Sequence, residues 1–187
     1  MVILAEQRKL MENFKDVEPA RVQRNGQAYV DTDEFIRPEL ERYLAMYREL
    51  DQVSQRGRLI RDQIDELIRR YHDYVIAGKI VAHYRQVGCR VKKGNVFEHV
   101  IPARSIRNML IQEICTLDQA LNAPTCIITP KKNKVLADNK LTKSTPNAWF
   151  FWRRYDVLNI QIETYDGTPV DMATWDFAKH CDYFNIK

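Results

Sequence analysis

The chain has 187 residues and a formal net charge of +4, with 45% hydrophobic and 29% charged residues. This is the composition of a folded globular protein, and the low counts of six Gly and seven Pro exclude a largely disordered chain. The sequence has no apolar run of the ~18 residues that a membrane span needs, and its first residues do not form a signal peptide. We therefore expect a soluble, cytoplasmic protein without a membrane partner, whose mild basicity is compatible with nucleic acid.

Residues 33–77 carry apolar side chains at helical spacing. One apolar stripe runs over 40–50 and a second over 60–75, with Gly57 between them. The sequence predicts either a helical hairpin broken near Gly57 or one long helix, since a glycine inside a helix costs only about 1 kcal/mol. We assign residues 1–78 to a helical arm, whose stripes pack within the chain or hold together a homodimer.

The second half changes period after Gly78. It predicts a strand over 96–101, a helix over 103–121 and a strand over 125–129. A helix should then begin at Pro130, because Thr129 can cap its first free N–H groups. A strand over 158–163 and a closing helix over 170–181 complete an aromatic-rich end. We expect an α+β fold with a helical N-terminal half and a second domain over 79–187.

Two segments of this second half carry the residues that can do chemistry. Residues 97–102 read Phe-Glu-His-Val-Ile-Pro, and residues 126–134 read Cys-Ile-Ile-Thr-Pro-Lys-Lys-Asn-Lys. Together they resemble the HNH, or ββα-metal, nuclease family, in particular the HNH module of RNA-guided CRISPR nucleases. The resemblance covers roughly residues 92–140. The four cysteines, Cys89, Cys115, Cys126 and Cys181, form no closely spaced pair, which points to the zinc-free branch.

The resemblance implies a role for each matching residue. Glu98 and Asn133 would hold one Mg²⁺ or Mn²⁺ ion through hard oxygen atoms. His99 would act as the general base that takes a proton from the attacking water. The middle asparagine of the family, which steadies that base, would be Asn122, with Asn108 as the second candidate. A kink before Pro102 is needed to bring Glu98 and His99 into one site, since neighbouring strand residues face opposite ways.

The sequence departs from the family pattern in two ways. The family usually has Asp where Glu98 stands, and the helix predicted over 103–121 would be an insertion within the ββα unit. Basic residues surround the motif, and we expect contacts with DNA phosphates, or with RNA, from part of this set. The candidates are Lys92, Lys93, Arg104, Lys131, Lys132, Lys134, Arg153 and Arg154.

Two functions from different classes follow. The first is a metal-dependent HNH-type endonuclease that hydrolyses DNA phosphodiester bonds. The second is a non-catalytic nucleic-acid-binding or interaction protein on a degenerate nuclease-like fold. Of the other histidines, His72 is expected to be an exposed helix residue, while the sequence around His83 and His180 does not indicate a particular role.

Overall fold

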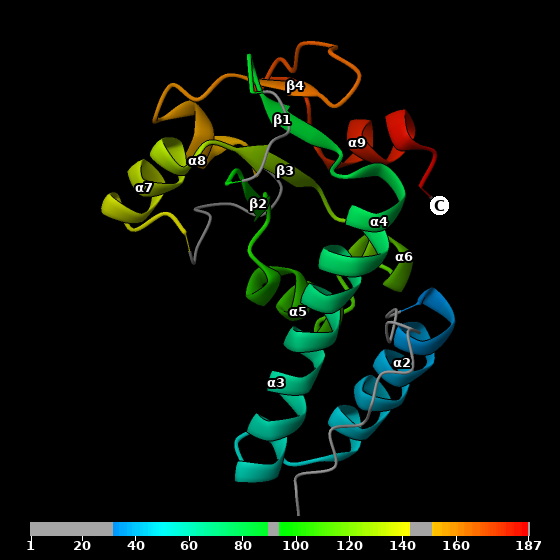
Figure 1. The fold of residues 1–187 in the computed structure, drawn as a ribbon. Coiled ribbons are helices and arrows are strands. Elements are labelled where there is room, and N and C mark those ends of the chain that lie inside the picture. Colours follow the sequence, from blue (N-terminus) through cyan, green and yellow to red (C-terminus); the bar gives the residue numbers. More distant parts are fainter. Residues whose placement is uncertain (1–31, 90–93, 143–150, 187) are drawn as a thin grey trace, which may run out of the picture. The chain divides into compact units, whose positions relative to one another are not determined.

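The computed structural model describes residues 32–89, 94–142 and 151–186. Asp31–Lys187 form one compact unit, in which helices and a four-stranded sheet share a core (Figure 1). The predicted α+β class, with helices preceding the sheet, is confirmed. The predicted boundary near residue 78 falls inside this unit. Lys92 and Lys93 lie outside the described residues.

A helical hairpin opens the described chain. It consists of α2 (Asp33–Glu49) and α3 (Gln55–Arg70), which pack side by side (Figure 1). Of the two predicted alternatives the hairpin is therefore confirmed, but the break lies at residues 50–54 and not at Gly57. Ser54 determines this position because its Oγ accepts a hydrogen bond from the Gly57 N–H (3.0 Å) and so caps α3.

Helix α3 continues into a π-helical turn, η1 (Tyr71–Ile76), and then into α4 (Ala77–Ile80). π-Helical turns are rare and occur frequently at functional sites. This turn carries His72, which is fully buried and donates its Nε2–H to the carbonyl of Ala120 (3.1 Å). The prediction that His72 is exposed is wrong, because α6 covers this side of the helix.

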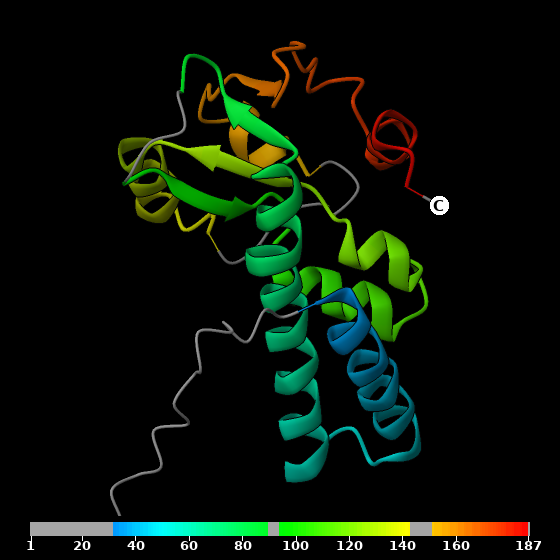
Figure 2. The ribbon, with the colours of Figure 1, turned by 45° about the vertical axis from the view of Figure 1, so that its right-hand side comes forward.

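The sheet has the strand order β2–β3–β1–β4. Its strands are β1 (Tyr84–Gln86), β2 (Val96–His99), β3 (Thr125–Ile128) and β4 (Ile162–Thr164). Strand β3 lies antiparallel to β2 and parallel to β1 (Figure 2). All four residues of β3 are buried, as expected for a central strand covered on both faces.

The segment between β2 and β3 holds two helices instead of the one predicted over 103–121. They are α5 (Ala103–Ile111) and α6 (Leu117–Leu121). The chain turns at Glu113, whose φ is +57°, and Thr116 then starts α6 with a reciprocal capping box to Gln119. Apolar spacing alone did not reveal this break, because both helices turn an apolar side to the same core.

Helix α7 (Pro130–Asp138) starts where the sequence predicted. The Thr129 Oγ1 accepts from the Lys132 N–H (3.4 Å), which confirms the cap. Two short helices follow, α8 (Arg153–Asp156) and α9 (Phe177–Phe184). The closing helix begins later than predicted because Asp176 caps it through the Lys179 N–H (2.8 Å). Within the described part of the chain, each helix is too short or too polar to cross a bilayer.

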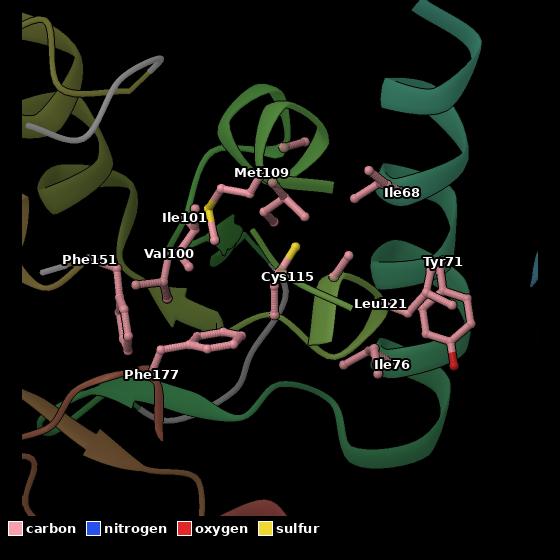
Figure 3. Close-up of a cluster of buried hydrophobic side chains, with 14 of the residues drawn as sticks. Ile68, Tyr71, Ile76, Val100, Ile101, Met109, Cys115, Leu121, Phe151 and Phe177 are labelled. Atoms are coloured by element: carbon pink, nitrogen blue, oxygen red, sulfur yellow. The ribbon is translucent and has the colours of Figure 1, made fainter. Parts of the chain in front are cut away.

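The core joins the hairpin to the sheet. Buried side chains of α2 and α3, such as Leu40 and Ile64, belong to the same hydrophobic cluster as those of the sheet. The apolar stripes of the helical half therefore pack within the chain. Figure 3 shows side chains that converge from η1, the β2–α5 connection, α5 and the C-terminal part, among them Tyr71, Ile76, Val100, Ile101, Met109, Phe151 and Phe177.

A series of buried hydrogen bonds connects α9 to the sheet. The Trp175 indole N–H donates to the Tyr84 hydroxyl (2.9 Å), and that hydroxyl donates to Nδ1 of His180 (2.7 Å). His180 in turn donates its Nε2–H to the carbonyl of Asn122 (2.9 Å). Every member is satisfied only while His180 is neutral, because the protonated ring has no lone pair to accept from Tyr84.

Gly57 gives a test of the hairpin. A Cβ at this position would lie 2.7 Å from the Asp51 carbonyl oxygen and 2.9 Å from that of Gln52. Helix propensity alone predicts that Gly57→Ala stabilises the chain by about 1 kcal/mol. We expect the opposite, a loss of roughly 1–3 kcal/mol, because the backbone turn has to move.

Urea unfolding of Gly57→Ala, with Arg58→Ala at the exposed neighbouring position as control, measures this change. A gain in stability for Gly57→Ala would mean that the turn does not approach the helix as closely as described.

The buried histidines predict acid sensitivity. Burial lowers the pKa of His72 and of His180 to about 4, and burial and the neighbouring histidines lower that of His83 well below its usual value. In the unfolded chain the histidine pKa values are near 6.5, so below that pH the unfolded chain binds protons that the folded chain does not bind. Stability is therefore fully present above about pH 6.5 and is lost as the pH falls from there toward 4.

We expect each of these histidines to lower the free energy of unfolding by up to about 1.4 kcal/mol for each pH unit in that window. Urea unfolding at pH 7.5, 6.0 and 5.0 tests this, and a His180→Gln variant should show a shallower dependence because one titrating group is gone. A free energy of unfolding that stays level from pH 7.5 to 5.0 contradicts the expectation.

Candidate functional site

A pocket of about 580 Å³ lies between α3, the end of β2 and the start of α5. Figures 1 and 2 show these three elements beside one another. Glu98 and His99, the central pair of the sequence motif, both line it. The other charged residues of its wall come from the two helices: Arg61, Asp62, Asp65, Arg69, Arg104 and Arg107.

The Glu98 carboxylate is held by a fully buried arginine. Arg154, in α8, places Nη2 at 2.6 Å from Oε1 of Glu98, whose side chain is 15% exposed. The same Nη2 donates to the carbonyl of His99, and Nη1 donates to the carbonyl of Leu141 (3.0 Å). Burial raises the pKa of Glu98, and the charge of Arg154 opposes that rise. Arg154 thus binds the end of β2 to the segment that follows α7.

His99 stands at the end of β2 against a second histidine. Its ring centroid lies 5.0 Å from that of His72, and its Nε2 is buried without a hydrogen-bond partner among the described residues. The Nδ1 of His72 is also buried without a partner. Burial, followed by the nearby His72, Arg69 and Arg154, lowers the pKa of His99 to about 3. The imidazole is therefore neutral at pH 7.

Asn133 lies in the first turn of α7, half-buried, and its backbone N–H donates to the Thr129 carbonyl (3.0 Å). The chain enters α7 beside the start of β2, because Val96 pairs with Ile128, and leaves it at Leu141, which shares Arg154 with Glu98. Asn133 does not belong to the pocket wall, and no hydrogen bond among the described residues joins it to Glu98 or His99.

The two candidates for the middle asparagine lie elsewhere. The Asn122 side chain donates to the Asp118 carbonyl (2.9 Å), and its own carbonyl accepts from His180. The Asn108 amide oxygen accepts from Arg107. Among the described residues, no hydrogen bond joins either asparagine to His99, whose ring lies beside those of His72 and Phe97.

The predicted nucleic-acid contacts divide into exposed and buried residues. Arg104 is exposed and lines the pocket. On α7, Lys131 is exposed, Lys132 is half-buried and Lys134 is paired with Asp138 (2.8 Å), while Arg153 is paired with Asp156 (3.2 Å). The predicted contact of Arg154 with nucleic acid is wrong, because this side chain is fully buried and bonded within the protein.

Sequence reasoning missed three residues of this pocket. Arg61 and Arg69 belong to the helical half, and their spacing of eight positions on one helix places them on one side. Arg107 was not among the basic residues expected to contact nucleic acid. A signal was available for α5, since Arg104 and Arg107 stand one turn apart immediately after the Glu98–His99 motif.

The arrangement offers a carboxylate, a neutral imidazole and several guanidinium groups at one cavity. The described residues contain no cluster of three or more His, Cys, Asp or Glu that could hold a metal ion. Comparison of the chain with protein-family models, with curated proteins and with solved structures finds no match. The function therefore has to be argued from this site.

The Arg154–Glu98 pair predicts a strong and coupled stability effect. Arg154→Met leaves a mostly buried carboxylate without its cation, and we expect a loss of roughly 3–5 kcal/mol. Combining it with Glu98→Gln should recover part of that loss, because the uncompensated charge is removed as well. Urea unfolding of the two single variants and the double variant measures the coupling.

Arg153→Met is the matched control, because Arg153 is exposed and its pair with Asp156 should contribute less than about 1 kcal/mol. Strictly additive effects of the substitutions at residues 98 and 154 would show that the two side chains are not paired in solution.

Proposed function

We propose that this chain is a metal-dependent endonuclease of the HNH type, which hydrolyses phosphodiester bonds of DNA inside the cell. One observation carries the proposal: Glu98 and His99, neighbours on β2, both line a cavity whose wall is rich in arginine. The order of elements adds support. Strand β2, the α5–α6 insertion, the antiparallel strand β3 and helix α7 follow the sequence of parts in a ββα unit.

Glu98 and Asn133 would hold a hard divalent cation such as Mg²⁺ or Mn²⁺, and Asn133, which does not line the pocket, would have to turn toward it to do so. Glu98 has one carboxylate oxygen engaged by Arg154, and Oε2 accepts no hydrogen bond among the described residues. The Asn133 side chain likewise makes no hydrogen bond to a described residue. Two oxygen ligands from the protein leave further positions for water and phosphate oxygens, as Mg²⁺ prefers. The bound ion would stabilise the negative charge that develops on the phosphate and the leaving oxygen.

His99 is the residue for the proton transfer. Because Nε2 is enclosed by protein atoms, Nδ1 is the nitrogen that would take a proton from a water in the pocket. The neutral imidazole has the lone pair that this step needs. A phosphate anion bound beside the ring would raise its low pKa toward the working pH, because opposite charge favours the protonated form.

A second candidate function rests on the Arg154–Glu98 pair. A guanidinium 2.6 Å from the carboxylate opposes a second cation at the same group. This contact favours a non-catalytic nucleic-acid-binding protein, in which Glu98 is a structural residue and the pocket binds phosphate without cleaving it.

A nicking assay separates the two functions. Supercoiled plasmid is incubated with pure protein and Mg²⁺ or Mn²⁺, with EDTA in a parallel reaction and a single-stranded RNA as alternative substrate. We expect metal-dependent nicking that His99→Ala reduces by roughly 10²–10⁴-fold, the usual contribution of a general base. Asn133→Ala should raise the metal concentration that half-maximal activity needs.

Asn139→Ala, an exposed asparagine at the other end of α7, is the matched control and should leave the nicking rate unchanged. Retardation of DNA without cleavage in either metal would reject the nuclease and support the binding protein. Nicking that survives His99→Ala would reject the assigned base.

A further inference from the structure

The pocket wall carries more arginines than acids: Arg61, Arg69, Arg104 and Arg107 against Asp62, Asp65 and Glu98. Asp65 is paired with Arg69 (3.1 Å), and Glu98 is paired with Arg154. Arg61, Arg104 and Arg107 form no ion pair among the described residues. The remaining acid of the wall is Asp62, so three guanidinium groups face one carboxylate that is not already paired.

Arg107 is the most deeply buried of these three arginines. Its side chain belongs to a residue that is 5% exposed, and its Nε and Nη2 donate to the neutral amide oxygen of Asn108 at 3.2 and 2.9 Å. Burial lowers the pKa of Arg107. Burying a cation without a carboxylate is costly, and such a group usually has an anionic partner. Asp65 and Asp62 favour the charged form of Arg107, and Arg61 and Arg104 oppose it. Among the described residues no carboxylate forms an ion pair with Arg107.

Arg61 faces the same cavity from the opposite wall. Its Nε is buried and has no hydrogen-bond partner in the part of the chain that the structure describes. One wall of the cavity, α3, therefore carries the Arg61 Nε donor without a partner among the described residues. The other wall, α5, carries the buried guanidinium of Arg107. Planar guanidinium groups bind phosphate oxygens in pairs, which makes a phosphate group the anion of matching shape and charge.

We infer that Arg61 of α3 and Arg107 of α5 form a phosphate-binding site that holds a backbone phosphate of a nucleic acid next to His99. Its identification with the nucleic-acid backbone rests on the proposed function, whereas the phosphate site itself does not. The helical half then supplies one wall of the site. Arg104, exposed one turn before Arg107, lies where a neighbouring phosphate of the same strand would pass.

Binding without metal tests the site separately from cleavage. A fluorescently labelled single-stranded DNA decamer is titrated with the full chain in EDTA, and its anisotropy is recorded at several salt concentrations. Inorganic phosphate and a mononucleotide serve as competitors. We expect Arg61→Gln and Arg107→Gln each to weaken binding about tenfold or more. Each should also reduce the slope of log affinity against log salt by about one.

Arg58→Gln is the control, because Arg58 is exposed on the same helix and does not line the pocket. Its affinity should stay within about twofold of the parent chain. Thermal unfolding gives a second readout. Arg107→Gln removes a buried charge that has no carboxylate partner, so its melting temperature should stay level or rise while binding falls. A purely structural arginine would show the reverse.

The outcomes separate the two ideas. Weak binding by Arg61→Gln and Arg107→Gln, in a chain that never nicks DNA, supports the phosphate site and rejects the nuclease. Nicking and binding that both survive these substitutions overturn the site alone. Absence of binding by the parent chain also overturns it. Displacement of the decamer by equal concentrations of inorganic phosphate would show that the site takes free phosphate and not the nucleic-acid backbone.

Discussion

The buried guanidinium of Arg154 holds the end of β2, which carries Glu98 and His99, in place. Arg154 contacts the Glu98 carboxylate, the His99 carbonyl and the Leu141 carbonyl, so three separate segments meet at one side chain. The contact to the His99 carbonyl fixes the backbone at the end of β2. The contact to Leu141 fixes the exit of α7 beside that strand. The orientation of Glu98 and His99 toward the pocket therefore depends on a residue 55 positions further along the chain.

Local patterns in the sequence were sufficient for the elements that carry the motif. The strand that contains Glu98, the buried strand β3 and the start of α7 at Pro130 each follow from short-range chemistry: apolar runs, β-branched residues and a threonine cap. The hairpin also followed from spacing. Its turn was misplaced because glycine marks either a break or a close approach, and at Gly57 it is the approach of the Asp51 carbonyl that matters.

The residues that were misjudged are those whose role depends on what covers them. Arg154 follows an aromatic block and reads as the basic edge of a binding surface, yet tertiary packing buries it completely. His72 reads as a polar position on an amphipathic helix, yet α6 covers it and supplies the Ala120 carbonyl. Periodicity reports which residues share a face. It does not report which other element lies against that face, and so it cannot separate a solvated charge from a buried one.

The same limit explains why the helical half was expected to be an arm. Its charged side, which includes Arg61 and Asp65, looks solvated in sequence but forms one wall of the pocket that Glu98 and His99 complete. If all charges of the wall were paired within the protein, the cavity would need no bound anion. Among the described residues, this wall instead leaves the Arg61 Nε without a partner, and the opposite wall buries Arg107 with the neutral Asn108 amide as its hydrogen-bond partner. A fold retains unsatisfied donors at a cavity at the expense of its own stability, and an anion that fills the cavity removes that cost. Helix α3 of the hairpin is therefore part of the site, because it forms one wall of the cavity.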